Sequence, residues 1–264
     1  MKLTIVGNTG SMSGPNGAAS CYLVQAEAVD PETGRTRTWS VAMDLGPGSF
    51  GQLWRYMNPR DLDALLITHG HADHMADIIS MHVFLKWHPE GACTRLFTAG
   101  PAELVRRIVD IHGYASPSEI ASDFDIRTVR PGATLRVGPM TVTAFKANHP
   151  VEAYGFRIEG PSEDGESTAT IAYTGDTDSC DGMIKMAHGV DLLLSECGFT
   201  DNDRVRGIHL SGTRAGLLAA GGNVGQLVLT HIQPWTNVEV PFAEARAVYD
   251  GPLEVAFPGQ VYTV

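Results

Sequence analysis

The chain has 264 residues, of which 43% are hydrophobic and 19% are charged, and its formal net charge is −11. A charge this negative disfavours broad binding to nucleic acids or anionic membranes, which needs a basic face. It still allows a small anionic substrate where bound cations dominate the local field. The length suits a single domain over residues 1–264, and no linker or low-complexity tract divides it.

The pattern of apolar residues predicts alternating strands and helices. Strands are expected at 2–7, 19–27, 38–44, 62–67, 94–98, 133–137, 140–147, 153–159, 168–174, 190–195, 226–231, 253–257 and 260–264. Helices are expected at 49–57, 74–87, 101–112, 117–122, 180–188, 211–220 and 241–249, and the polar stretch 159–167 as a hairpin loop. No segment has the length and apolarity of a membrane span or signal peptide, and the four cysteines lack pair spacing. We therefore expect a cytoplasmic protein with reduced thiols.

Residues 68–77, THGHADHMAD, place three histidines and two aspartates within ten positions. The cluster follows a predicted strand and opens a predicted helix, and loops at the carboxyl ends of strands commonly carry ligand-binding groups. His69 and His71 are two positions apart and converge only on extended backbone, whereas Asp73 and His74 are adjacent and point elsewhere. The spacing therefore predicts that the first pair binds one metal ion and the second pair another.

Three further candidate ligands, His149, Asp176 and His231, each follow a later predicted strand. The predicted ligands are His69, His71 and His149 for the first ion and Asp73, His74 and His231 for the second, with Asp176 bridging both. Each ion keeps an open position, so the expected chemistry is hydrolysis by a metal-bridged hydroxide. Nitrogen and oxygen donors suit Zn²⁺, Mn²⁺ or Fe²⁺ without deciding among them, and Zn²⁺ is the ion we expect.

These motifs, with the opening VGNTGSMSGPNGAASCYLV and the segment AMDLG, resemble the metallo-β-lactamase superfamily in its ribonuclease-Z-like and phosphodiesterase branch. The resemblance runs from residue 5 to residue 235 and so covers nearly the whole chain. It implies an α+β fold, a four-layer αββα sandwich with sheets inside and helices outside. Within AMDLG, Asp44 is expected either to orient the metal-binding loop or to start a turn.

Three longer segments, HPVEAYGFRI, YTGDTDSCDG and HLSGTRAGLLAAGGNVGQLVLTHIQPWT, are similar to actinobacterial cyclic-nucleotide phosphodiesterases of this fold. That similarity implies hydrolysis of 3′,5′-cyclic AMP to 5′-AMP, with cyclic GMP as an open second substrate, and a homodimer. The residues alone lead to a dinuclear metallohydrolase, and the substrate comes from the resemblance.

His209 precedes LSGT, where Ser211 is expected to cap a helix whose free N–H groups would suit a phosphate oxygen. We predict that His209 and Ser211 bind the phosphate and that His209 protonates the leaving oxygen, a role that the resemblance also implies. The predicted catalytic residues are therefore His209, Asp73 and Asp176.

The sequence does not decide the roles of three side chains near these motifs. Ribonuclease Z enzymes pair the equivalent histidine with an acid just ahead of the bridging aspartate. Tyr173 stands there in this chain, which puts an acid–histidine pair in doubt. Glu196 is expected to support a metal-binding histidine or to lie at the surface. Trp235 is expected to stack on the purine or to join the core.

The alternatives are a tRNA 3′-processing endonuclease of the ribonuclease Z type, a thioester, lactone or β-lactam hydrolase, and a metal-binding regulatory module without turnover. The endonuclease needs a long clamping arm, but only 26 residues separate His149 from Asp176. A lactamase usually carries cysteine at the position of Asp176, and regulatory relatives usually lose ligands. We therefore expect a small cyclic nucleotide as substrate, and neither a membrane nor an extended nucleic acid as partner.

Overall fold

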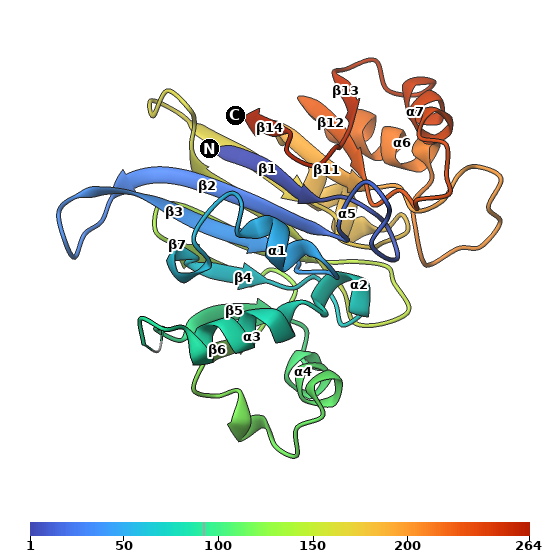
Figure 1. Cartoon of the computed structure of the whole chain (residues 1–264). Coiled ribbons are helices and arrows are strands. Elements are labelled where there is room, and N and C mark those ends of the chain that lie inside the picture. The colour runs from blue at the N-terminus through green and yellow to red at the C-terminus, as the bar shows by residue number, and fades with distance from the viewer. Residues whose placement is uncertain (92) are drawn as a thin grey trace.

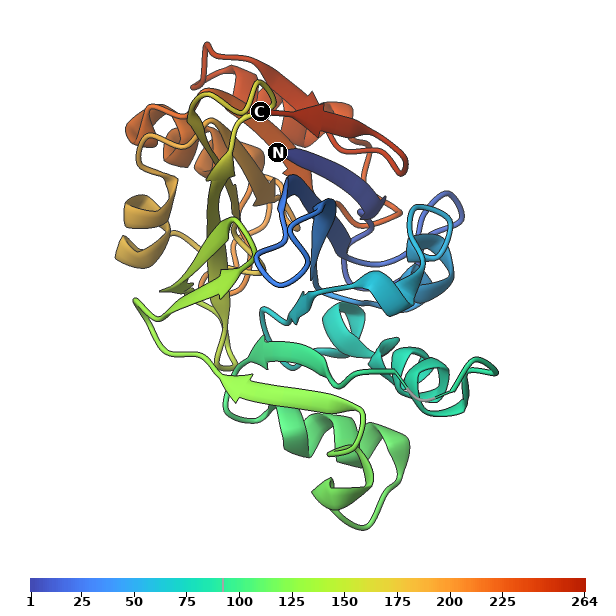
Figure 2. The same ribbon diagram turned by 90° about the vertical axis from the view of Figure 1, so that its left-hand side faces the viewer.

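The computed structural model describes residues 1–91 and 93–264, and within these residues it confirms the predicted αββα sandwich. Two seven-stranded sheets lie face to face with helices on their outer faces, as Figure 1 and Figure 2 show. In spatial order the first sheet consists of β14 (Val261–Thr263), β1 (Lys2–Gly7), β2 (Cys21–Val29), β3 (Thr36–Met43), β4 (Ala64–Leu66), β5 (Leu96–Gly100) and β6 (Phe124–Thr128). The second consists of β13 (Leu253–Val255), β12 (Gln226–Thr230), β11 (Leu192–Glu196), β10 (Thr168–Tyr173), β9 (Tyr154–Pro161), β8 (Met140–Lys146) and β7 (Thr134–Val137).

The helices divide between the two outer faces. The first sheet is covered by α1 (Ser49–Leu53), α2 (Ala72–Met75), α3 (Ile78–Trp87) and α4 (Leu104–His112). The 3₁₀ turn η1 (Pro59–Asp61) follows α1, and the 3₁₀ turn η2 (Pro117–Glu119) follows α4. The second sheet is covered by α5 (Asp181–Ala187), α6 (Gly212–Gly222) and α7 (Glu239–Arg246).

Each sheet begins as an antiparallel meander and continues with parallel strands. In the first sheet β1, β2 and β3 are antiparallel, and β4, β5 and β6 continue in parallel with β3. In the second, β7 to β10 are antiparallel, and β11, β12 and β13 continue in parallel with β10. As a result, the carboxyl ends of β8, β10, β11 and β12 all lie at the same end of the second sheet. Bridges from Thr9 to Ile232 and from His69 to Ala153 join this end to the first sheet. We call the joined strand ends and their loops the rim.

Apolar side chains fill the space between the sheets because alternate residues of each strand point inward. Ile5 and Tyr22 of the first sheet and Phe156, Ile171 and Tyr173 of the second are fully buried there. The rings of Tyr22 and Tyr173 meet across the interface with their centroids 4.6 Å apart. Burying each large apolar side chain contributes about 1.5–3 kcal/mol, so the rim loops rest on two tightly joined sheets.

The helix expected at 74–87 is wrong in its extent, because the chain divides it into α2 and α3. The N–H of Asp77 donates to the carbonyl of Leu45 (3.0 Å), and the Asp77 carboxylate accepts from the N–H of Phe50 (2.9 Å). These long-range bonds turn the chain between Met75 and Ile78. Two of the candidate ligands therefore lie on the single turn of α2, and α3 packs on the sheet.

Other expectations are mostly confirmed. The polar stretch 159–167 contains the expected hairpin loop, since β9 ends at Pro161 and β10 begins at Thr168. Strand β6 is missing from the expected set, and its pairing with β5 defines it. The helix expected at 117–122 is only the 3₁₀ turn η2. All four cysteines are free, and no helix in the described part of the chain is long and apolar enough to cross a membrane.

Candidate metal centre

Every candidate ligand lies at the rim. His69 and His71 follow β4, Asp73 and His74 lie on α2, His149 follows β8, Asp176 follows β10, and His231 follows β12. The structure brings all seven together in the two predicted groups: His69, His71 and His149 in the first, and Asp73, His74, Asp176 and His231 in the second, with ligand atoms within 4.8 Å of one another in each. The division expected from the spacing of THGHADH is therefore present in the fold.

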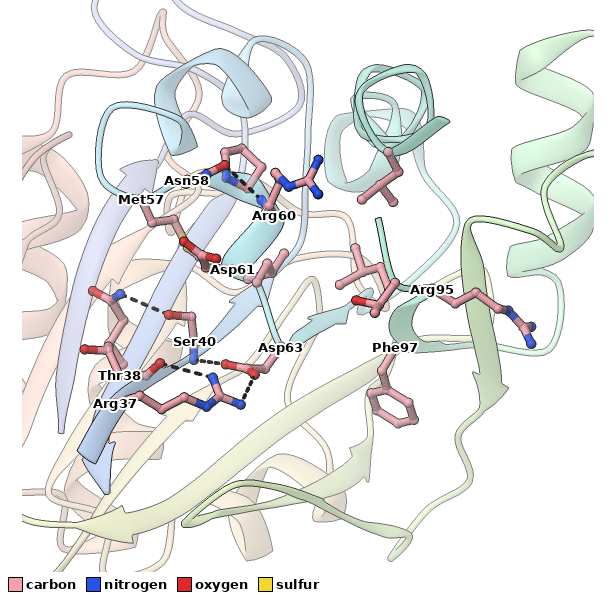
Figure 3. A pocket seen from close by; sticks show the side chains of 16 residues that line it. Arg37, Thr38, Ser40, Met57, Asn58, Arg60, Asp61, Asp63, Arg95 and Phe97 are labelled. Atoms are coloured by element: carbon pink, nitrogen blue, oxygen red, sulfur yellow. Dashed lines mark hydrogen bonds and ion pairs between the residues drawn. The ribbon is translucent and has the colours of Figure 1, made fainter. Parts of the chain in front are cut away.

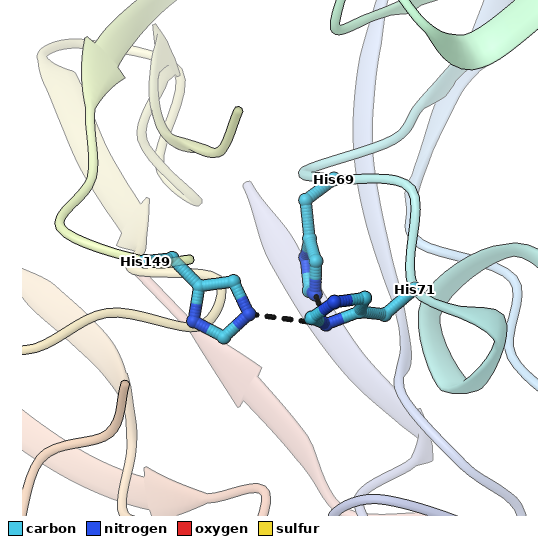
Figure 4. A group of neighbouring side chains, drawn as sticks. All are labelled: His69, His71 and His149. Atoms are coloured by element: carbon cyan, nitrogen blue, oxygen red, sulfur yellow. Dashed lines mark hydrogen bonds between the residues drawn. The ribbon is translucent and has the colours of Figure 1, made fainter. Parts of the chain in front are cut away.

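The first group consists of three imidazoles, and Figure 4 shows His149 reaching the other two from a separate loop. His71 Nδ1 lies 3.1 Å from His69 Nε2 and 3.1 Å from His149 Nε2. His149 Nδ1 donates to the carbonyl of Ile208 (3.0 Å), which leaves its Nε2 lone pair facing the group. His71 has the extended backbone that the spacing predicted, with φ −74° and ψ 148°. Three ring nitrogens therefore converge on one point.

The second group combines two imidazoles with two carboxylates. His74 Nε2 lies 3.1 Å from His231 Nε2 and 3.1 Å from Asp176 Oδ1. The same nitrogen is 3.3 Å from Asp73 Oδ2. The other oxygen of Asp176, Oδ2, lies 3.8 Å from His69 Nε2 in the first group. Asp176 therefore spans the space between the groups, as a bridging ligand requires.

Asp44 fixes the orientation of ligands in both groups. Its Oδ2 accepts from His74 Nδ1 (2.7 Å) and from the hydroxyl of Thr68 (3.0 Å). Thr68 Oγ1 in turn lies 3.0 Å from His69 Nδ1. Because Nδ1 is engaged in both histidines, Nε2 is the nitrogen left for a ligand. Asp44 is fully buried at a φ of +61°, a left-handed conformation that non-glycine residues seldom adopt. Of the two expectations for Asp44, orientation of the loop is confirmed.

Burial and neighbouring charges prepare both groups for a cation. Burial lowers the pKa of all three histidines of the first group, so they present neutral imidazoles. Burial opposes ionisation of Asp176, but His231 and His74 hold the pKa of its carboxyl well below the usual range. Burial also opposes charge on His74, yet Asp176 and Asp44 raise the pKa of its imidazole well above the usual value. The same carboxylates that favour a proton on this imidazole would also favour a divalent cation bound in place of that proton.

The spacing of the donor atoms fits divalent metal ions. A tetrahedral ion with metal–nitrogen distances of about 2.0–2.1 Å holds its ligand atoms about 3.3–3.4 Å apart. Neighbouring ligand atoms are 3.1 Å apart in the first group and 3.1 to 3.4 Å apart in the second. In the described part of the chain Asp176 Oδ1 is buried without a hydrogen-bond partner, and such an oxygen is stabilised by a cation. Each group could therefore hold a metal ion.

Comparison with known proteins identifies the family. Residues 40–232 match the family described as the Beta-lactamase superfamily domain. The chain belongs to this superfamily. Among its relatives, the probable metallo-hydrolase YhfI of Bacillus subtilis is 28% identical over 99% of each chain. A crystal structure of YhfI superposes with a TM-score of 0.82 at 27% identity and covers 100% of this chain and 99% of that one.

Two further relatives extend the comparison. An uncharacterized protein of Mycobacterium leprae is 34% identical over 100% of this chain and 89% of its own length. A ribonuclease Z of Bradyrhizobium sp. is 26% identical over 79% of this chain and 85% of its own length. The predicted family is confirmed, and the chain is a metallo-hydrolase of the beta-lactamase superfamily.

His209 of this metallo-hydrolase lies beside both ligand groups. Its ring centroid is 5.8 Å from that of His149 and 5.4 Å from that of His231. His209 Nδ1 donates to Glu196 Oε1 (3.0 Å), so Nε2 remains for a substrate. The chain passes close to this ring at Gly198, where a Cβ would lie 2.8 Å from the ring. The structure therefore places His209 at the site as predicted.

The pairing of His209 with Glu196 corrects two expectations. Glu196 is fully buried, so its expected surface position is wrong, and its hydrogen-bonded histidine is His209, which is not one of the seven candidate ligands, although its carboxylate also lies within 4.8 Å of a ring nitrogen of His231. An acid–histidine pair is thus present, although Tyr173 occupies the expected acid position and donates to Asp44 instead (3.0 Å). The acid comes from β11, the parallel neighbour of β10. Burial opposes the charge on His209, but Glu196 and Asp176 raise the pKa of its imidazole to about 9.

Side chains of the protein occupy part of the N-terminus of α6, the predicted phosphate site. Ser211 precedes α6, but its hydroxyl donates to Asp201 instead of capping the helix. The N–H of Gly212 donates to Glu244 Oε2 (3.1 Å), so a carboxylate from α7 already occupies this helix end. The capping expectation for Ser211 is therefore wrong, and the N–H of Gly212 is not free for a phosphate oxygen.

Trp235 is exposed at the surface, and a large hollow lies apart from the ligand groups. Trp235 is 68% exposed, so its alternative position in the core is wrong and base stacking stays a prediction. A hollow of about 680 Å³ lies at the start of β3 and β5, the end of the first sheet opposite the rim. Figure 3 shows that two of its charged side chains form an ion pair, Arg37 Nη2 with Asp63 Oδ1 (2.7 Å). It contains none of the candidate ligands.

Two contributors to the site are missed by sequence reasoning. Thr68 links Asp44 to His69, and its position directly before the first histidine of the motif is a usable signal. Arg107 of α4 donates from Nε to the carbonyl of Gly70 (2.9 Å) and so holds the loop that carries the first ligands. No local pattern marks Arg107, because its contact depends on how α4 packs.

Proposed function

We propose that this metallo-hydrolase is a dinuclear phosphodiesterase that hydrolyses 3′,5′-cyclic nucleotides, cyclic AMP first, to the 5′-monophosphates. The observation that carries the proposal is the buried Glu196–His209 pair beside two adjacent ligand groups. A ribose alkoxide is a poor leaving group and needs a proton donor, whereas the thiolate of a thioester leaves without one. The pair therefore supports phosphodiester chemistry over thioester hydrolysis.

The proposed ligands are His69, His71 and His149 for one ion and Asp73, His74 and His231 for the other, with Asp176 between them. Bound Zn²⁺, or Mn²⁺ or Fe²⁺, would supply Lewis acidity toward the phosphoryl oxygens and acidify a water molecule. A water oxygen forms the new bond to phosphorus as the bond from phosphorus to O3′ breaks. His209 Nε2 gives its proton to O3′, and Glu196 holds the other side of the ring and stabilises the imidazolium before transfer.

The segment between His149 and Asp176 supports a small substrate. Strands β9 and β10 with their hairpin loop occupy most of its 26 residues, which leaves no long arm to clamp tRNA there. The net charge of −11 also disfavours an extended polyanion. Cyclic AMP itself is proposed from the similarity of residues 149–158, 173–182 and 209–236 to cyclic-nucleotide phosphodiesterases. Stacking of the base on exposed Trp235 and assembly as a homodimer belong to the same proposal.

The test is hydrolysis in ¹⁸O-water by metal-loaded protein, with cyclic AMP, a 2′,3′-cyclic nucleotide, a precursor tRNA and a lactone as separate substrates. We expect cyclic AMP to yield 5′-AMP with the label on phosphorus, and Asp176→Ala to abolish the reaction. Asp164→Ala, in the exposed hairpin loop, is the matched control and should retain activity. Formation of 3′-AMP, or far more efficient cleavage of the tRNA, would overturn the substrate and favour the ribonuclease Z alternative.

A second test addresses His209. His209→Asn should keep the metal content and lower kcat on cyclic AMP by about 10²–10⁴-fold, the usual effect of losing a general acid. The loss should be smaller for bis(p-nitrophenyl) phosphate, whose leaving group needs less protonation. His188→Asn, at an exposed position, serves as control. Equal losses on both substrates would show that His209 only binds the phosphate.

A further inference from the structure

Asp178 connects the bridging aspartate's turn to three other segments of the site. It lies two residues after Asp176, and its backbone N–H donates to the carbonyl of Asn148 (2.8 Å), next to a candidate ligand. Its Oδ2 accepts from the N–H of Gly207 (2.7 Å). Its Oδ1 pairs with the guanidinium of Arg214 on α6, and the two side chains are only 6% and 15% exposed. One nearly buried ion pair therefore joins four chain segments at the rim.

The contact with Gly207 controls the segment that carries His209. Gly207 lies two residues before His209, and Ile208 between them accepts from His149 Nδ1 (3.0 Å). Glu196 holds only the ring of His209, through Nδ1. Asp178 instead holds the backbone that leads into this residue, so the ring and the backbone have separate anchors.

Arg214 orients the Asp178 carboxylate toward Gly207. The guanidinium engages Oδ1 of Asp178 and neutralises the carboxylate, so Oδ2 remains aimed at the N–H of Gly207. Arg214 also approaches Ser211 Oγ from Nε (3.4 Å), on the far side of His209 in the chain. Arg214 thus contacts Ser211, after His209, directly, and it reaches Gly207, before His209, only through Asp178.

We propose that the Asp178–Arg214 pair positions His209 for proton transfer to the leaving oxygen. The inference rests on the proposed role of His209 as proton donor. Neither Asp178 nor Arg214 contacts the leaving oxygen or the candidate metal-binding atoms of the two ligand groups, so both are positioning residues. Because a misplacement of about 1 Å at a reacting group costs about 10²-fold in rate, a loosened backbone at Gly207 should weaken proton transfer without emptying the ligand groups.

The experiment measures how strongly the rate depends on the leaving group. Metal-loaded variants hydrolyse a series of methyl aryl phosphodiesters whose phenols span a wide pKa range, and log kcat/KM is plotted against that pKa. His209→Asn, Asp178→Asn and Arg214→Gln should each steepen the slope, with a loss of about 10²-fold for the poorest leaving group and little loss for the best. Arg214→Lys keeps the charge and should restore part of the native slope. Metal content should equal that of the native protein.

Asp63→Asn is the matched control, because it breaks a similar partly buried pair with Arg37 at the opposite end of the sheet (Figure 3). It should lower the Tm and leave the slope unchanged. The proposal is overturned if Asp178→Asn lowers all rates equally, or if it depletes metal as Asp176→Ala does. Should Asp178→Asn fail to fold, the two Arg214 variants decide the same question.

Failure of the proposed function has a different signature. If His209→Asn leaves the slope unchanged, His209 is not the proton donor, whatever the Asp178 variants do. Since the aryl series does not depend on cyclic AMP being the substrate, loss of the cyclic AMP assignment alone leaves the positioning test intact.

Discussion

Replacing Glu196 by glutamine should move the alkaline limb of the activity profile to lower pH. In the native protein burial is outweighed by Glu196 and Asp176, which raise the pKa of His209 from 6.5 to about 9. A raised pKa keeps the imidazole protonated below that value, so the proton donor is present near neutral pH and is lost as the pH rises through about 9. Glutamine removes the charge, and the pKa should fall toward 6.5, by up to about 2.5.

The size of the effect follows from the two pKa values. At about pH 8 the protonated fraction of His209 falls from about 0.9 for a pKa of about 9 to about 0.03 for a pKa of about 6.5, roughly a 30-fold loss. Near pH 6 both forms are mostly protonated, so the variant should retain much of its activity there. The predicted defect of Glu196→Gln is therefore large in mildly alkaline solution and small in mildly acidic solution.

The assay is kcat/KM for cyclic AMP between about pH 6 and about pH 10, with Glu159→Gln on β9 as a control that should leave the profile unchanged. Glu196 also accepts from the N–H groups of Thr177 (2.9 Å) and Gly198 (2.7 Å). The glutamine amide would face one of these donors at a cost of about 1–3 kcal/mol, so Tm is measured in parallel. A uniform fall in activity, with the alkaline limb unmoved, would refute the assignment of Glu196 as the group that keeps His209 protonated.

Three further predictions concern the ligand groups and their supports. Asp176→Ala should lower occupancy of both groups and His231→Ala mainly that of the second; elemental analysis that finds a single ion, unaffected by Asp176→Ala, would rule out the two-ion arrangement. Asp44→Asn should weaken metal affinity by about 10–100-fold in a chelator titration, because it disturbs the orientation of the ligating histidines; unchanged affinity would leave it only a structural role. Gly198→Ala should impair cyclic AMP hydrolysis while metal content stays native, because its Cβ would lie 2.8 Å from the His209 ring; full activity would show that the loop can yield.

Local pattern was sufficient for the ligands and for their division into two groups. His69 and His71 point the same way because alternate residues of an extended chain do, and Asp73 with His74 diverges because the two are adjacent. Of the strands that deliver the later ligands, β8 alternates apolar and polar residues and β10 and β12 are largely apolar, and polar residues follow each of them. These features depend on neighbours in the chain, so sequence reasoning finds them.

Contacts between distant segments lay beyond such reasoning. The break between α2 and α3 depends on bonds from Asp77 to Leu45 and Phe50, which no periodicity within 74–87 reveals. The Ser211 hydroxyl is diverted from its helix by Asp201, and the carboxylate of Glu244 from α7 occupies the N–H that was expected to be free. In both cases a favourable local signal was overridden by a side chain or backbone group brought close only by packing.

Residue types and their order along the chain identify a metallo-hydrolase of the beta-lactamase superfamily with seven candidate ligands. The partner of His209 was decided by the tertiary structure alone. Glu196 reaches that histidine because β10 and β11 lie side by side in parallel, so the turn with Asp176 and the end of β11 meet at the rim. Strand order is a property of the whole sheet, set by how its faces bury apolar surface, and it leaves no mark within the short segments that it brings together.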